Sequence, residues 1–416
     1  MGSVMQATEL MDTNSTVQSA MNPSTTGVSR APQICIIGGA IAIVLGFVLS
    51  SSSPAGWLQD YLVHYTFLVS ITLGALFFVF LQHLTRAGWS VTVRRTAELM
   101  AGTTPMLVAV AFLPIAVTLF IDGLNLYPWA ASDFFLHHAE LRHKTIYLNI
   151  PFFLLRAAFC LAAWWWLGRF YMTRSLAQDT DGDPRWTLVM EKWSPAAALL
   201  FTVTVTLAAF DWVMSLAPAW YSTIFPVYIF SGCVVGGLAG LILILLLAQA
   251  LGFLSHRVVT VEHYHDLGKL LFGFVIFWGY IAFSQYMLIW YGNIPEESQF
   301  YLPRQQGIWL YVSLGLVFGH LLIPLVGMMP RAIKRNPWTL GFFAVWLLVF
   351  HWLDLYWLIK PNWHPTVGPL SLIGGILGGV GVFGIVIAIV LKGLTRYPPI
   401  PVRDPRLNEA IHHEVV

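Results

Sequence analysis

The chain of 416 residues is 57% hydrophobic and only 10% charged, with a mean hydropathy of +0.70. A soluble domain usually carries about a quarter charged residues. The composition therefore excludes a soluble enzyme and a disordered chain, and it predicts an all-α polytopic membrane protein. A β-barrel is excluded too, because its strands would alternate apolar and polar residues, whereas the apolar runs here are continuous. A net charge of +2 gives no reason to expect a nucleic acid partner.

The polar N-terminal segment, residues 1–30, lacks hydrophobic periodicity and is predicted to be a flexible cytoplasmic tail. Its acidic residues Glu9 and Asp12 precede its only cation, Arg30. A secretory signal peptide would instead begin with a short basic segment. The first apolar run is therefore interpreted as a transmembrane helix that is not cleaved off. This helix and the outer loop that follows it make up residues 31–60.

Ten apolar runs follow, each near or above the ~20 residues that cross a bilayer. They predict ten transmembrane helices, at residues 33–50, 61–82, 99–121, 146–169, 195–217, 224–254, 268–290, 307–329, 338–359 and 367–392. The sixth run is long for one straight span, so we expect it to tilt or to extend into the cytoplasm.

The positions of Lys and Arg predict the orientation of the chain, because cytoplasmic loops carry an excess of both. Of 22 Lys and Arg residues, 16 fall in the N-terminal tail, in loops 2–3, 4–5, 6–7 and 8–9, and in the C-terminal tail. The opposite loops hold only Arg142, Lys144, Arg304 and Lys360. Both termini are therefore predicted to be cytoplasmic, with residues 396–416 as the C-terminal tail.

A short motif occurs twice, at the outer ends of the fifth and ninth runs. Residues 211–220 and 354–363 both read D-x6-P-x-W, and both helices run from inside to outside. The shared direction favours an internal duplication. The duplication predicts two related four-helix bundles, spans 2–5 in residues 61–223 and spans 6–9 in residues 224–366. The first helix and the tenth, which lies within residues 367–395, are then peripheral.

Ionisable side chains inside the apolar runs are candidate functional residues, because a charge in the hydrocarbon region costs a few kcal/mol. His351 and Asp354 are spaced i, i+3 and share one helix face. A carboxylate beside an imidazole can orient it and exchange protons with a quinol or a water chain. The candidate proton path comprises Asp211, His351, Asp354, Arg156, Asp122, His320, Glu98, Lys269 and Gln285.

Structural interpretations stay open for the same residues. His351 and Asp354 could serve only to fix helix packing, and Arg156 could be a buried counter-ion of one of the acids. Glu98 and Lys269 lie at inner ends of spans and could simply face cytoplasmic water.

No redox centre is predicted within this chain. Cys35, Cys160 and Cys233 stand singly in apolar runs without metal-ligand spacing, so we expect buried free thiols and no metal site. Two membrane histidines could ligate haem b. A rise of about 1.5 Å per residue, however, places His320 and His351 about 10 Å apart in height, which argues against a shared haem.

Four segments resemble an integral membrane component of bacterial alternative complex III, in the polysulfide-reductase-like (NrfD-like) family. They are residues 148–156, LNIPFFLLR; 210–216, FDWVMSL; 283–297, FSQYMLIWYGNIPEE; and 351–354, HWLD. The segment in the seventh span is the most specific, and the similarity extends over the chain after residue 30. The paired four-helix bundles of that family agree with the repeat.

The resemblance implies a membrane subunit of a quinol:electron-acceptor oxidoreductase in the electron transport chain of a bacterial cytoplasmic (inner) membrane. Its partners would be a sister NrfD-like subunit that oxidises menaquinol, an iron–sulfur subunit, and c-type cytochrome subunits that hold haem c. This chain would bind no cofactor itself and would provide a proton-translocation path. The family's path is carried onto Asp211, His351, Asp354 and Arg156, with Asp122 as an outer exit.

Two alternatives remain open. The chain could itself bind menaquinol or quinone, with His351 and Asp354 taking the quinol protons. It could instead be a secondary transporter, a class in which internal repeats are also common. Because transporter repeats are often inverted, two bundles that start on the same side favour the oxidoreductase component.

Overall fold

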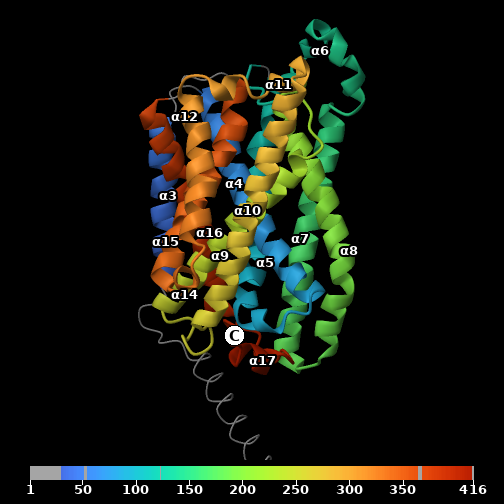
Figure 1. Cartoon of the computed structure of the whole chain (residues 1–416). Coiled ribbons are helices and arrows are strands. Elements are labelled where there is room, and N and C mark those ends of the chain that lie inside the picture. The colour runs from blue at the N-terminus through green and yellow to red at the C-terminus, as the bar shows by residue number, and fades with distance from the viewer. Residues whose placement is uncertain (1–29, 51–53, 122, 364–367, 415–416) are drawn as a thin grey trace, which may run out of the picture.

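The computed structural model describes residues 30–50, 54–121, 123–363 and 368–414 (Figure 1). Every regular element within these ranges is helical, and ten helices are long and apolar enough to cross a membrane. The protein is therefore an all-α, multi-pass membrane protein, as the composition predicts. The predicted N-terminal tail lies outside the described residues, except for Arg30.

The membrane helices run roughly side by side along the long axis of the molecule (Figure 1). They are α3 (Ala31–Ser50), α4 (Pro54–Leu84), α5 (Val91–Thr118), α7 (Ile150–Asp181), α8 (Arg185–Ala208), α9 (Phe225–Ala250), α10 (Val261–Gly292), α12 (Ile308–Gly315), α15 (Pro337–Ile359) and α16 (Pro369–Arg396). The fifth span continues from α8 through a π-helical turn, η4 (Ala209–Val213), and through η5 (Met214–Leu216). The eighth continues from α12 through the π-helical η7 (Leu316–Leu322) and α13 (Ile323–Gly327).

Short helices form the connections at both ends of the molecule. They are η1 (Gly88–Ser90), η2 (Pro128–Ala130), α6 (Phe134–His137), η3 (Ala139–Ile146), α11 (Pro295–Ser298), η6 (Pro303–Gln305), α14 (Arg331–Arg335), η8 (Lys360–Trp363) and α17 (Leu407–Ile411). The segment that contains α6 projects beyond the other loops at the top of Figure 1.

Several helices extend beyond their predicted apolar runs, at the end of the molecule that lies lowest in Figure 1. Arg94 and Arg95 lie inside α5 and are buried, so their assignment to a loop was wrong. The sixth span ends at Ala250, and the chain then turns with Phe253 and Leu254 buried. That apolar run is long because it includes a buried turn.

The predicted bundles are two closed groups of contacting helices. In the first, α4 and α7 each pack against both α5 and α8. In the second, α9 and η7 each pack against both α10 and α15. The helices α3 and α16 pack against each other outside these groups, as expected for the first and tenth spans.

The central crossing of α4 and α9 joins the two bundles at a pair of glycines. A Cβ atom on Gly74 would lie 2.0 Å from the carbonyl oxygen of Cys233, and one on Gly237 would lie 2.5 Å from the Cα of Gly74. Only glycine fits so close a backbone approach. This contact sets the distance between the bundles and hence the position of the buried polar residues.

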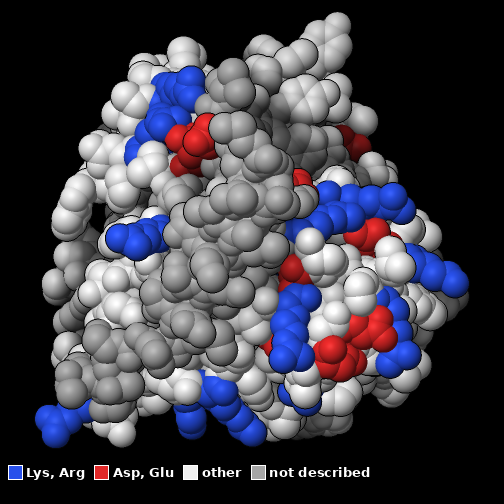
Figure 2. Space-filling view, turned by 90° about the horizontal axis from the view of Figure 1, so that it is seen from below, with Lys and Arg blue, Asp and Glu red and all other residues white. Residues whose placement is uncertain are grey.

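The lower face gathers many of the Lys and Arg residues, with acidic residues between them (Figure 2). The C-terminal segment and α17 lie at this end (Figure 1). This end of the molecule is therefore the one that the sequence predicts to be cytoplasmic.

Candidate functional site

The carboxylate of Asp354 in α15 is the centre of a buried polar cluster in the second bundle. Asp354 is 1% exposed. It accepts one hydrogen bond from the hydroxyl of Tyr228 on α9 and another from Nε1 of Trp278 on α10, at 3.1 Å. Both donors come from other helices, so the carboxylate links three helices of the bundle.

His351 lies one turn before Asp354 but uses different partners. Its Nε2 is 2.8 Å from Oγ of Ser70 on α4, while its Nδ1 has no hydrogen-bond partner. The prediction that Asp354 orients this imidazole was therefore wrong. The ring lies against α9 instead, where a Cβ on Gly236 would come within 2.7 Å of its Cδ2.

His320 completes the cluster from the π-helical segment η7. Its ring packs edge-on against Trp278, with centroids 3.9 Å apart, and lies 6.4 Å from the ring of His351. The side chain is fully buried, and neither ring nitrogen has a hydrogen-bond partner. Buried polar atoms without partners are uncommon, and π-helical turns occur frequently at functional sites.

The predicted height difference between His320 and His351 was wrong, and the register of spans eight and nine explains why. Nε1 of Trp357 donates to Oγ of Ser313 at 2.7 Å. His320 follows Ser313 by about two helical turns, and His351 precedes Trp357 by nearly the same length. The two histidines therefore lie at one level.

The depth of the two histidines therefore does not exclude a shared haem, but the close packing around them does not fit one. Trp278 packs directly on His320, and Ser70 and the glycine face of α9 enclose His351. Within the described ranges, no group of three or more His, Cys, Asp or Glu side chains has the arrangement of a metal site.

The first bundle holds a second buried cluster, in which Arg156 of α7 pairs with Asp211 of η4. Nε and Nη2 of Arg156 lie 2.6 and 3.0 Å from the two carboxylate oxygens of Asp211. The rings of Tyr147 and Phe152 lie 3.8 and 4.1 Å from the guanidinium carbon. Arg156 is thus the counter-ion of Asp211, one of the two interpretations that the sequence left open.

The two clusters are separate. No chain of hydrogen bonds links the Arg156–Asp211 pair to Asp354 in the described part of the protein. The single path through both bundles that the sequence suggests is therefore absent from the direct protein contacts. Each bundle instead has its own acid, at corresponding positions of the repeated motif.

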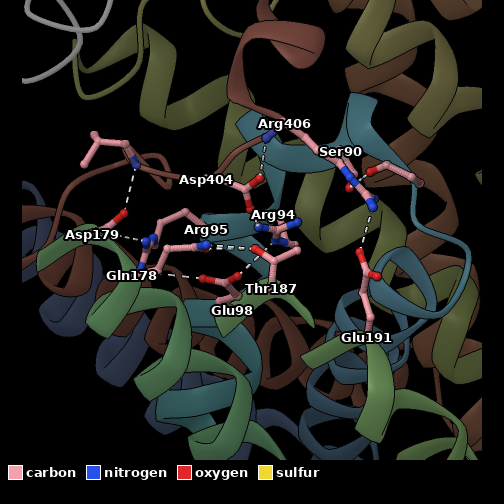
Figure 3. A network of polar contacts seen from close by, with 12 residues as sticks. Ser90, Arg94, Arg95, Glu98, Gln178, Asp179, Thr187, Glu191, Asp404 and Arg406 are labelled. Carbon is pink, nitrogen blue, oxygen red and sulfur yellow. Dashed lines mark hydrogen bonds and ion pairs between the residues drawn. The ribbon is translucent and has the colours of Figure 1, made fainter. Parts of the chain in front are cut away.

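Glu98 belongs to an ionic cluster that the C-terminal segment covers (Figure 3). Its Oε1 is 3.1 Å from Nε of Arg94, and its Oε2 is 3.6 Å from Nη1 of Arg95. Arg94 also pairs with Asp404, and Arg95 pairs with Asp179 of α7. Glu98 is only 1% exposed, so the expectation that it faces cytoplasmic water was wrong.

Three predicted residues remain. The side chain of Lys269 is 47% exposed and lies 2.5 Å from Asp266, which agrees with a position facing water. Gln285 is buried, and its Oε1 has no hydrogen-bond partner. Asp122 lies outside the described residues.

Tyr228, Trp278 and Ser70 were not predicted from the sequence, because hydroxyl and indole groups are common in apolar helices and carry no formal charge.

The burial of Arg304 was not predicted either. Nε of Arg304 donates to the carbonyl oxygen of Trp357 at 3.2 Å, at the outer end of α15. Burial lowers the pKa of Arg304 to about 9, although the nearby Tyr301 and Tyr228 act in the opposite direction.

A cavity of about 620 Å³ lies beside the Asp354 cluster, between α10 and α12. Tyr228 and Trp278, the two donors to Asp354, form part of its wall, and so does Arg304. His351 and Asp354 themselves do not line it.

Comparison of this sequence with protein-family models gives no match, and a search of curated proteins gives none either. The fold and the site therefore define a class: a ten-span helical membrane protein with a buried acid in each of two bundles. A more specific assignment is a proposal that rests on the residues themselves.

Proposed function

We propose that this protein is a membrane subunit of a bacterial quinol:electron-acceptor oxidoreductase of the alternative complex III type, and that its second bundle relays protons. The observation that carries the proposal is the cluster of Asp354, His351 and His320. All three are fully buried within apolar helices, and three imidazole nitrogens there have no hydrogen-bond partner.

A proton relay needs groups that can both take up and release a proton, and carboxyl and imidazole groups do so. In this cluster the hydroxyl of Tyr228 gives Asp354 a polarisable neighbour, and Ser70 does the same for His351. The two imidazole rings lie at one level of the membrane, with 6.4 Å between their centroids. Proton transfer across this gap needs a bridging water molecule, because a water donates and accepts hydrogen bonds at once.

The Arg156–Asp211 pair has a different role in this proposal. Both oxygens of Asp211 already bind the guanidinium, so the pair ties α7 to the end of the fifth span. We assign the relay to the second bundle and structural stabilisation to this pair. Glu98 likewise stabilises the cytoplasmic end, because its carboxylate is enclosed by two arginines.

The proposed partners are a sister membrane subunit that oxidises menaquinol, an iron–sulfur subunit and c-type cytochromes. Co-purification separates this proposal from a transporter. A tagged copy should bring down proteins that contain haem c and iron–sulfur clusters. If the chain purifies alone from membranes of its natural host, under conditions that preserve respiratory complexes, it is not a subunit of such a complex.

Binding of quinol by this chain itself is the second candidate. The cavity beside Tyr228 and Trp278 is the observation in its favour. Direct proton transfer from quinol to His351 or Asp354 has less support, because neither side chain lines that cavity.

The relay is tested with Asp354→Asn, which keeps the shape of the side chain and removes its acidity. We expect the assembled variant complex to show a lower rate of quinol oxidation or fewer protons released per electron. Glu296→Gln is the matched control, because Glu296 is an exposed carboxylate in α11. Normal turnover and normal proton release in assembled Asp354→Asn complex would make Asp354 a structural residue.

A further inference from the structure

The cavity between α10 and α12 opens toward the surrounding lipid. Its volume of about 620 Å³ falls in the roughly 300–1,000 Å³ range of sites for small organic ligands. Among its lining residues, Phe283 of α10 and Leu314 and Val317 of the eighth span expose 61%, 45% and 48% of their surface. Apolar side chains exposed on a membrane helix face acyl chains, so a ligand of this cavity can enter from the membrane.

Most of the polar residues of the cavity lie at its outer end. Because α10 ends at Gly292, Tyr286 lies within its last two turns, where its hydroxyl accepts a hydrogen bond from Nε2 of Gln305 at 3.2 Å. Trp290, which is 67% exposed, lies one turn further out. Tyr and Trp side chains are enriched at the level of lipid headgroups. The outer end of the cavity is therefore at headgroup level.

Arg304 gives this end of the cavity a positive charge. It is 1% exposed, and its guanidinium donates only to uncharged acceptors: the carbonyl oxygens of Phe300, Trp357 and Leu358 and the side-chain oxygen of Asn362. In the described ranges no carboxylate pairs with it. A buried cation beside a cavity favours an anionic ligand, and arginine is suited to phosphate.

The opposite end of the cavity is apolar. Its wall continues along the eighth span to Leu321, about 20 Å from the helix start at Ile308. The cavity thus combines a positive polar end at headgroup level with an apolar groove directed into the membrane. A quinol ring would need free polar partners near both of its oxygens, whereas Tyr228 and Trp278, further along the wall, already donate their hydrogen bonds to Asp354.

We propose that this cavity binds one phospholipid, with its phosphate near Arg304 and Gln305 and one acyl chain in the groove between α10 and α12. Bound lipid would complete the wall beside Tyr228 and Trp278 and keep water from reaching Asp354 from the side. The lipid itself takes part in no reaction, so its binding can be measured separately from the proton relay.

The test is a titration of delipidated full-length protein in detergent with phosphatidylglycerol, followed by native mass spectrometry. Leu314→Trp fills the groove, and Gln305→Leu removes an exposed polar group at the headgroup end. We expect wild-type protein to bind one lipid copy about tenfold more tightly than either variant, a difference of about 1.4 kcal/mol. Leu199→Trp on α8, where Leu199 is 72% exposed, is the matched control and should bind as wild type does.

Competition identifies the ligand class. Diacylglycerol, which has the acyl chains without the phosphate, should not displace phosphatidylglycerol. Equal binding of phosphatidylglycerol by wild type, Leu314→Trp and Gln305→Leu would overturn the site. Displacement of phosphatidylglycerol by diacylglycerol or by a menaquinone would overturn it too. Since binding is measured without turnover, its failure is distinguishable from failure of the proton relay.

Discussion

The hydroxyl of Tyr228 on α9 donates a hydrogen bond to the buried carboxylate of Asp354 on α15, across 126 residues of sequence. Trp278 donates to the other carboxylate oxygen from α10. A buried carboxylate held by two neutral donors has no counter-ion in these contacts. It is therefore suited to change its protonation state without breaking an ion pair.

Tyr228→Phe removes one of the two donors and keeps the ring. Loss of a hydrogen bond to a buried polar group costs about 1–3 kcal/mol. We expect a lower melting temperature and slower proton-coupled turnover, with turnover less impaired than in Asp354→Asn. Thermal unfolding and quinol oxidation measured on the same preparation check this. A variant that is as stable and as active as wild type would show that Tyr228 does not support the carboxylate.

Asp211→Ala tests the ion pair of the first bundle, because it leaves the buried guanidinium of Arg156 without its counter-ion. Breaking a buried pair from one side typically costs about 3–5 kcal/mol. The double variant Arg156→Met/Asp211→Ala, which combines Asp211→Ala with the second single variant Arg156→Met, removes both charges and should recover much of that loss. Thermal unfolding of wild type, both single variants and the double variant measures the coupling. Additive losses in the double variant would contradict a structural ion pair.

Gly74→Ala tests the crossing of α4 and α9. The new Cβ would lie 2.0 Å from the backbone oxygen of Cys233, and a backbone atom moves only with its helix. Overpacking of this kind costs about 1–3 kcal/mol or more. Gly273→Ala in α10 is the control, because its Cβ meets nothing within 4 Å. Melting temperature and yield should fall for the first variant alone, and an equal fall in both would mean that the crossing is not the cause.

Asp404→Ala tests whether the C-terminal segment closes the end of the molecule that holds the Glu98 cluster. In this variant Arg94 would keep its ion pair with Glu98 but lose its ion pair with Asp404. We expect the segment to loosen and Glu98, now 1% exposed, to become reactive toward a water-soluble carbodiimide. Peptide mass spectrometry of the labelled protein gives the extent of modification. Equal protection of Glu98 in variant and wild type would show that other contacts hold the segment.

The ten spans could be predicted from the sequence because a bilayer imposes one length and one composition on every crossing helix. The direct partners of each side chain could not be predicted in this way. His351 bonds to Ser70 across 281 residues, although its spacing pointed to Asp354 on the same helix. Helical spacing gives a shared face, but neighbouring helices determine which atoms each side chain meets on that face.

The depth of a residue also depends on more than its position in an apolar run. His320 and His351 lie at one level because Ser313 is paired with Trp357, a register that hydropathy cannot reveal. Burial of Glu98 escaped prediction for a similar reason, since the covering residue Asp404 comes from the far end of the chain. The candidate residues were found because charge is rare in this sequence, whereas their roles required the contacts.

Infrared difference spectroscopy of the assembled complex, recorded between the resting and the quinol-reduced states, tests the central claim most directly. We predict a carboxyl C=O band that appears or shifts on reduction, is lost in Asp354→Asn and is retained in Asp211→Asn. A spectrum of Asp354→Asn that keeps every carboxyl band of the wild type would contradict a proton relay through Asp354.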